Sequence, residues 1–375
     1  MKIAWLTNCQ APYREPMWRE IAARANLQVS FLFRDEEVRH WTWRDTVDYP
    51  SRIVRTRRVP IPNALARRLD EPRMAMLDLG VADEVLDGAD ALIFQEWWQL
   101  AYLWCALRAR LRGIPYLLYS ESTLDSRQFS TGLPAWLRSL VFRKAGAVIV
   151  PGPAAARAAV SNGTPPERIV ESVNSIDLSQ FDGRVRELRR GRRLDPHHRY
   201  VYVGQLIERK NVGSLIRAFA ATAGPTDTLD IAGDGVLMDT LRALTEECQV
   251  AERVRFLGFL EEPEVVRLLA ECHTLVLPST EEVYGFTALE AYVAGLQVVV
   301  SEVAGIAPNL TGRTGTWVVA PTVAALGGAL RGARECWTGW QEDVDVERMA
   351  SPRRVAEDIV RAVELARGAV GAAPG

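Results

Sequence analysis

The sequence predicts an α/β protein with two domains, each built on a parallel β-sheet. Short runs of apolar, largely β-branched residues alternate with longer segments of helical periodicity, a pattern typical of such sheets. The chain has 375 residues, 48% of them hydrophobic, which is enough for two separate cores. The arginine-rich segment 184–198 ends in Asp-Pro-His-His and indicates a linker. We therefore expect an N-terminal domain at 1–183 and a second domain at 184–349.

The first domain is expected to open with a buried strand at Lys2–Thr7. A loop through Tyr13 and Arg14 and then a helix follow it, and residues 34–62 are expected to be irregular. Because ligands bind at the carboxyl ends of parallel strands, residues after a strand are candidate binding groups. Further strands are expected at Leu27–Phe33, Ala91–Phe94 (with Trp98 after it), Pro115–Tyr119 (with Glu121 after it), Ala147–Val150 and Ile169–Val173.

The second domain contains the most informative stretch, Leu275–Ser301. It indicates a strand, an acidic loop, a helix over Phe286–Ala294 and another strand. Gly285 before the helix N-terminus lets backbone amides approach an anion. Glu282 and Glu290 are eight residues apart, which along one helix is about 12 Å. The other strands are expected at Tyr200–Val203, Leu229–Ala232, Arg253–Phe259 and Thr316–Val319.

Composition excludes several classes of function. The net charge of −2 gives no field that would draw the chain to nucleic acid. Five scattered cysteines and four histidines show no metal-ligand spacing, so we expect reduced thiols, no metal, no cofactor and a cytoplasmic location. The first residues indicate a strand rather than a signal peptide, and no apolar run is long enough to span a membrane.

Seven arginines between Arg52 and Arg73 suggest peripheral contact of the N-terminal domain with an anionic membrane. A solvated surface is the alternative interpretation of this stretch.

Residues 278–295 carry a resemblance to a known family. They read Pro278-Ser279-x-x-Glu282-x-Tyr284-Gly285-x4-Glu290-Ala291-x3-Gly295. This resembles the E-x7-E signature of retaining glycosyltransferases of the GT-B fold, glycosyltransferase family four. The resemblance extends over nearly the whole chain. It implies two Rossmann-like domains facing across a cleft, with a nucleotide-sugar donor on the C-terminal domain and an acceptor on the N-terminal one. It also implies that a final helix, at about 350–370, returns to the first domain.

The resemblance assigns roles to donor-side residues. Glu290 is expected to bind the ribose hydroxyls and Glu282 the hydroxyls of the donor sugar, while amides around Phe286 and Thr287 hold the diphosphate. The loop from Gly204 to Asn211 is similar to the family's Gly-Arg-Leu-x-x-x-Lys-Gly, whose Arg and Lys grip the diphosphate. Lys210 matches that lysine, but Gln205 stands where arginine is expected and Arg209 is the candidate substitute. Gly235, Phe259 and Gly285 complete the expected donor site.

On the acceptor side, the resemblance makes Glu121 the candidate for orienting the acceptor hydroxyl, in a region where many relatives have His or Asp. Tyr13, Arg14 and Trp98 are the candidate acceptor-binding residues. The alternatives are that Glu121 caps the following turn, that Tyr13 and Arg14 contact the donor phosphates, and that Arg14 is solvated. The expected reaction is sugar transfer from a nucleoside-diphosphate-sugar to an acceptor hydroxyl, with retention. A catalytically inactive nucleotide-sugar-binding partner subunit and a GT-B-type epimerase remain alternatives. The donor, the acceptor and the oligomeric state stay open.

Overall fold

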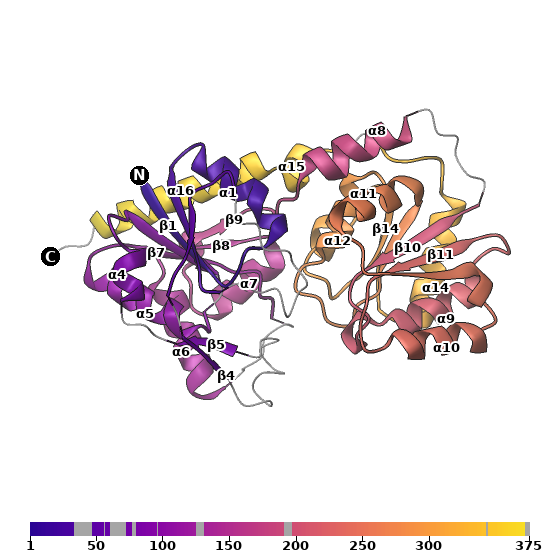
Figure 1. Cartoon of the computed structure of the whole chain (residues 1–375), viewed down its shortest axis with the longest axis horizontal. Coiled ribbons are helices and arrows are strands. Elements are labelled where there is room, and N and C mark those ends of the chain that lie inside the picture. The colour runs from indigo at the N-terminus through magenta and orange to yellow at the C-terminus, as the bar shows by residue number, and fades with distance from the viewer. Residues whose placement is uncertain are drawn as a thin grey trace. The chain divides into compact units, whose positions relative to one another are not determined.

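The computed structural model describes residues 1–33, 47–55, 57–60, 73–76, 80–95, 97–124, 131–190, 197–342 and 344–371. The chain forms two compact units, Met1–Ser175 with Ser351–Gly375, and Ile176–Ala350 (Figure 1). Residues 176–183, which the sequence placed in the first domain, belong to the second unit because Ile176 and Phe181 pack into its core.

The first unit is built on a parallel seven-stranded sheet with the order β3-β2-β1-β6-β7-β8-β9. The order reverses between β1 and β6, which makes that pair the topological switch point of the sheet. The strands are β1 (Lys2–Thr7), β2 (Asn26–Phe31), β3 (Ser51–Ile53), β6 (Ala91–Gln95), β7 (Tyr116–Tyr119), β8 (Ala147–Val150) and β9 (Ile169–Glu171).

Helices cover both faces of this sheet. In β1, Ile3 and Trp5 face α1 (Glu15–Ala22) and α16 (Pro352–Gly371), whereas Ala4 and Leu6 face the opposite core. Figure 1 shows α16, in yellow, beside α1. The other face carries α4 (Val81–Val85), α5 (Leu100–Leu111), α6 (Gly132–Lys144) and α7 (Pro153–Ser161).

The sequence prediction of an irregular segment at 34–62 was wrong in part. Ser51–Ile53 extends the sheet as β3, and β4 (Arg57–Pro60) pairs antiparallel with β5 (Arg73–Met76). All three are short edge or hairpin strands, whose local sequence pattern is weak because pairing with other strands stabilises them.

The second unit has a parallel six-stranded sheet with the order β12-β11-β10-β13-β14-β15. Its switch point lies between β10 and β13. The strands are β10 (Arg199–Val203), β11 (Thr228–Ala232), β12 (Val254–Gly258), β13 (Thr274–Leu277), β14 (Gln297–Ser301) and β15 (Thr316–Val319).

One face of this second sheet is covered by α9 (Val212–Thr222), α10 (Met238–Glu247) and α14 (Val323–Glu335). The other face carries α8 (Val185–Arg189), α11 (Glu262–Glu271), α12 (Phe286–Val293), α13 (Ala307–Leu310) and α15 (Val346–Ala350). The predicted linker is therefore helical at its start, because Val185 is fully buried in the core of this unit. The sequence interpretation had assigned no helix to 238–247.

Candidate functional site

The predicted donor residues lie at the carboxyl ends of the strands of the second sheet. Lys210 ends the short 3₁₀-helix η4 (Glu208–Lys210), which follows β10, and Glu282 lies in the loop after β13. The two strands are neighbours at the switch point, and Lys210 Nζ forms an ion pair with Glu282 Oε2. The Ser279 hydroxyl donates a hydrogen bond to the same carboxylate oxygen at 3.2 Å. The sequence named both Lys210 and Glu282, but only the fold pairs them.

Backbone and side-chain hydrogen bonds hold the loop after β10 to the loops after β13 and β15. The Thr280 N–H donates to the carbonyl of Arg209 at 2.9 Å. Asn211, in the left-handed region at φ 55°, donates from Nδ2 to the carbonyls of Pro278 and Pro321, each at 3.0 Å. Asn tolerates this conformation better than most residues. The sequence analysis did not single out Asn211, although its place at the glycine of the family loop was a signal.

Glycines bring the loops after β10 and β11 into close contact. A Cβ on Gly233, at φ +139°, would lie 1.8 Å from the carbonyl oxygen of Gly204. A Cβ on the predicted Gly235 would lie 2.4 Å from the carbonyl oxygen of Leu206. The two loops thus bring their backbones to one place at the sheet edge, which side chains would prevent.

Helix α12 begins where the sequence placed it, at Phe286. Gly285 is its N-cap at φ +105°, and a Cβ there would meet Leu277 Cδ2 at 2.9 Å. The first amides of a helix, here those of Phe286 and Thr287, have no intrahelical acceptor and favour an anion. Glu282 lies outside this helix, so the separation of about 12 Å expected for two acids on one helix does not apply.

Glu290 lies on α12 and is half-buried. Burial, with a smaller contribution from the charge of Glu262, raises the pKa of the Glu290 carboxyl to about 8. In the part of the chain that the structure describes, no hydrogen-bond donor contacts this carboxyl group. A hydroxyl-bearing ligand would supply the missing donors.

The remaining donor candidates lie at the same edge. Phe259 follows β12 and is 50% exposed, as suits a ring that stacks on a ligand. Gln205 is exposed and Arg209 is half-buried. Which cation replaces the family's arginine stays a prediction.

The acceptor candidates belong to the carboxyl edge of the first sheet. Arg14 is 4% exposed, and its Nη2 lies 3.1 Å from Oε1 of Glu121. The alternative of a solvated Arg14 is therefore wrong, because the loop after β1 folds this side chain over the sheet edge. Tyr13 and Trp98 are half-buried. Their contact with an acceptor stays a prediction.

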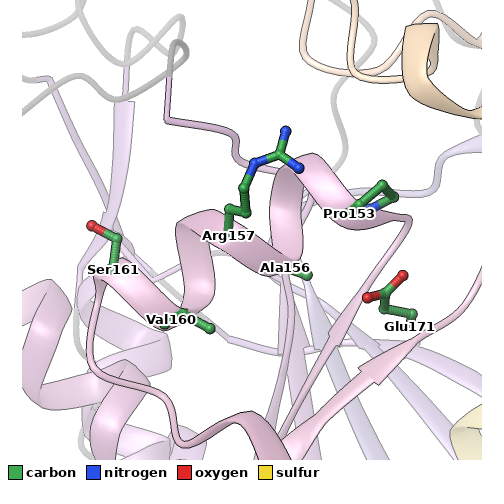
Figure 2. Close-up of a pocket in the computed structure, with 6 residues that line it drawn as sticks. All are labelled: Pro153, Ala156, Arg157, Val160, Ser161 and Glu171. Atoms are coloured by element: carbon green, nitrogen blue, oxygen red, sulfur yellow. The ribbon is translucent and has the colours of Figure 1, made fainter.

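A separate hollow of about 390 Å³ lies between α7 and the edge strand β9 (Figure 2). Its lining comes from Pro153, Ala156, Arg157, Val160, Ser161 and Glu171, and contains no predicted site residue. Within the described ranges, no group of three or more His, Cys, Asp or Glu side chains is arranged to hold a metal ion. Nor does any described helix have the length and apolar character needed to cross a bilayer.

Comparison with known proteins agrees with this arrangement. Residues 10–171 match the family model described as "Glycosyl transferase 4-like domain", and residues 186–337 match "Glycosyl transferases group 1". Two parallel-sheet α/β units with sites at their carboxyl edges are the GT-B class of glycosyltransferase architecture. The chain belongs to the GT-B glycosyltransferases of the family-four type.

The curated relatives match the sequence of this chain over only part of their own length. A glycogen synthase of Mycobacterium tuberculosis H37Rv is 34% identical over 161 residues, which is 42% of this chain and 38% of that protein. A 2-deoxystreptamine glucosyltransferase of Streptomyces kanamyceticus is 30% identical over 32% of each chain. The matched region thus spans less than half the length of these curated relatives.

Solved structures match over the whole chain. The lipopolysaccharide outer core galactosyltransferase WaaB has a TM-score of 0.69 at 17% identity, covering 97% of this chain and 99% of that one. Anabaena Alr3699/HepE in complex with UDP has a TM-score of 0.68 at 19% identity, covering 99% of both chains. At these identities the likeness shows the shared fold.

Proposed function

We propose that this protein transfers a sugar from a nucleoside-diphosphate-sugar to an acceptor hydroxyl with retention of the anomeric configuration. The observation that carries the proposal is the grouping at the β10/β13 switch point. There a paired lysine and glutamate and the N-terminus of α12 share one sheet edge with the carboxyl of Glu290, which no hydrogen-bond donor of the described residues contacts.

Each of these groups has a role in holding the donor. Lys210 and the amides at the start of α12 stabilise the departing diphosphate, which carries about two negative charges. Glu282 accepts hydrogen bonds from hydroxyls of the sugar, and Glu290 from the ribose diol. Without donor, Lys210 and Glu282 neutralise one another, so donor binding exchanges an internal ion pair for contacts to the ligand.

In the proposed reaction, the acceptor attacks on the face from which the diphosphate leaves. The acceptor oxygen bonds to the anomeric carbon, the bond to the phosphate oxygen breaks, and the acceptor's proton passes to that phosphate oxygen. Glu121 orients the attacking hydroxyl. The positive charge comes from Lys210 and the helix N-terminus, and we propose no metal or cofactor. We also propose a cytoplasmic location, supported by five free cysteines.

Thermal shift with UDP-, GDP-, ADP- and dTDP-sugars, followed by assay of nucleotide release, tests the proposal. UDP-glucose is the first donor to try because the HepE fold neighbour was crystallised with it. Stabilisation together with slow nucleotide release is the expected result. Tight binding without turnover supports the inactive-subunit alternative, and isomerisation of the sugar without acceptor supports an epimerase. The comparisons favour neither alternative.

The predicted membrane contact is better supported at α6 than at the arginine stretch. Of the seven arginines in that stretch, only Arg52 and Arg55 have side chains that the structure describes. On α6, Leu133 is 73% and Trp136 is 57% exposed, whereas Arg138 of the same helix is buried. We propose that this apolar face rests on anionic lipid, since the last turn of α6 also carries exposed basic residues.

Co-sedimentation with phosphatidylglycerol vesicles tests this contact. We expect Trp136→Ser to weaken vesicle binding by roughly tenfold, which corresponds to the ~1–2 kcal/mol of apolar burial lost. Leu365→Ser is the matched control, because Leu365 is 44% exposed on α16 of the same unit. Equal binding by the wild type and Trp136→Ser would contradict the contact.

A further inference from the structure

A buried polar cluster surrounds Arg14 at the carboxyl edge of the first sheet. Arg14 ends the 3₁₀-helix η1 (Pro12–Arg14) after β1, and only 5% of its side chain is exposed. Burial works against its charge, but the neighbouring Tyr13 and Glu121 outweigh that effect, so the pKa of Arg14 is raised. The guanidinium therefore remains charged at every working pH. Its partner Glu121, 3.1 Å away, is 14% exposed and so lies nearer the surface.

The ends of β1 and β6 fix the guanidinium from one side. The Gln95 amide is assigned the orientation that satisfies both of its neighbours, in which its oxygen accepts from Arg14 Nε at 3.1 Å and its nitrogen donates to Thr7 Oγ1 at 2.7 Å. Thr7 and Gln95 are the last residues of β1 and β6, the two strands that flank the switch point. Arg14 is thus held by the strand pair at which ligands bind in such sheets.

Tyr119 fixes the guanidinium from another side. Arg14 Cζ lies 5.0 Å from the centroid of the Tyr119 ring, within cation–π range. The Tyr119 hydroxyl donates to Asn174 Oδ1 at 2.8 Å, and both residues are buried. Asn174 is followed by Ser175, at which the main segment of the first unit ends, and the second unit begins at Ile176. A continuous buried chain therefore runs from the unit boundary through Tyr119 and Arg14 to Glu121.

We propose that Arg14 is a positioning residue, which holds the Glu121 carboxylate in a fixed orientation to accept a hydrogen bond from the attacking acceptor hydroxyl. This inference rests on the proposed transferase function. A carboxylate accepts several hydrogen bonds, so pairing with Arg14 is compatible with accepting another from the acceptor. Glu121 gains no proton in this scheme, because the acceptor's proton passes to the leaving phosphate oxygen.

The pattern of burial explains why Arg14 acts through Glu121. The guanidinium donors point to protein acceptors, Gln95 and Glu121, and the side chain is almost wholly covered. Substrate therefore meets the more exposed carboxylate. Tyr119 and Asn174 set the position of Arg14 and link it to the segment at Ser175, where the main part of the first unit ends.

The test compares Arg14→Gln, Arg14→Lys, Glu121→Gln and the double variant Arg14→Gln/Glu121→Gln in the full chain. The donor is whichever of UDP-, GDP-, ADP- or dTDP-glucose gives the largest thermal shift, and methyl glucosides serve as acceptor probes. We expect each single Gln variant to lower kcat for transfer by about 10- to 100-fold. Arg14→Lys should recover part of the rate, and the double variant should be no slower than either single one. Stabilisation by the nucleotide alone should stay unchanged.

Tyr119→Phe gives a milder version of the same test. It removes the hydrogen bond to Asn174 but leaves the ring beneath Arg14, and should reduce kcat by a few-fold, about what one hydrogen bond is worth. Tyr116→Phe is the matched control, because Tyr116 lies in the same strand, is buried and donates to the carbonyl of Val141 at 2.8 Å. It should transfer at the wild-type rate.

Three results would overturn the inference. The first is an unchanged transfer rate in Arg14→Gln. The second is additive losses in the double variant. The third is a loss of nucleotide-induced stabilisation in proportion to the loss of rate, which a purely structural role for Arg14 would give. If the wild-type chain neither binds nor consumes any donor of the panel, the transferase proposal fails, and this inference falls with it.

Discussion

Replacing Lys210 with alanine is the sharpest perturbation of the proposed donor site. In the ligand-free protein the change leaves Glu282, whose side chain is 11% exposed, with the Ser279 hydroxyl as its one hydrogen-bond partner among the described residues. Removing one partner of a fully buried ion pair costs about 3–5 kcal/mol, and this pair retains some solvent contact. We therefore expect a loss of roughly 1–2 kcal/mol in the free energy of unfolding.

The effect on catalysis should be larger. A unit charge about 4 Å from a phosphate oxygen, at an effective dielectric constant of about 20, contributes about 4 kcal/mol. Part of this is recovered by water and by the amides at the start of α12. The expected loss in nucleotide release and sugar transfer is therefore about 100- to 1,000-fold. Steady-state rates and thermal denaturation of the same samples separate the two effects.

Lys144→Ala is the matched control, because Lys144 is exposed at the end of α6 in the first unit. It should leave the rate unchanged. The chain has only three lysines, Lys2, Lys144 and Lys210, so nearby lysine substitutes do not complicate the comparison. A Lys210→Ala protein that is folded and as active as the wild type would refute the assignment of Lys210 to the leaving group.

Three further predictions concern acidity and backbone geometry. Nucleotide binding should release protons below pH 8, because ribose hydroxyls favour the ionised form of Glu290, whose pKa burial raises to about 8; calorimetry in buffers of different ionisation enthalpy measures this. Burial, with the charges of nearby groups, lowers the pKa of His198 to about 3. The stability that neutral His198 contributes is therefore complete above pH ~6.5. As the pH drops from there towards 3, the free energy of unfolding falls by up to about 1.4 kcal/mol per pH unit. Gly233→Ala should cost about 2–4 kcal/mol of stability, because the new Cβ would lie 1.8 Å from the Gly204 carbonyl oxygen. Gly328→Ala is the control, because no atom lies within 4 Å of a Cβ there, and it should be neutral or stabilising. Denaturant unfolding measures both.

The contrary outcomes for these three are distinct. Proton release that persists in Glu290→Gln would assign the titration to another group. An acid-unfolding profile that is the same for the wild type and His198→Gln would remove His198 as its cause. A Gly233→Ala protein as stable as the wild type would show that the two loops separate at little cost.

Local sequence features determined most of the regular structure. Strands such as Lys2–Thr7 and Ala147–Val150 lie where the sequence predicted them, and so does the helix that begins at Phe286. Buried parallel strands are short β-branched runs, and helices are bounded by glycine and polar residues, so both signals are contained in neighbouring residues. A glycine directly before a predicted helix, Gly285, was sufficient to predict an anion site lined by backbone amides.

The predictions that differed from the structure depended on distant contacts. Val185 turns the start of a predicted linker into a helix because it is buried in the core of the second unit. Ser51–Ile53 becomes a strand because it pairs with β2. Neither partner is close enough in sequence to leave a local pattern.

The sequence by itself therefore determined the α/β class and the family, and it named the candidate side chains of the site. Only the tertiary structure decided which of them meet: Lys210 with Glu282, 72 residues away, and Arg14 with Glu121, 107 residues away. It also placed Glu290 where burial raises the pKa of its carboxyl to about 8. The physical reason is that the order of strands in each sheet brings residues that are distant in sequence to the carboxyl edge of that sheet, where they pair.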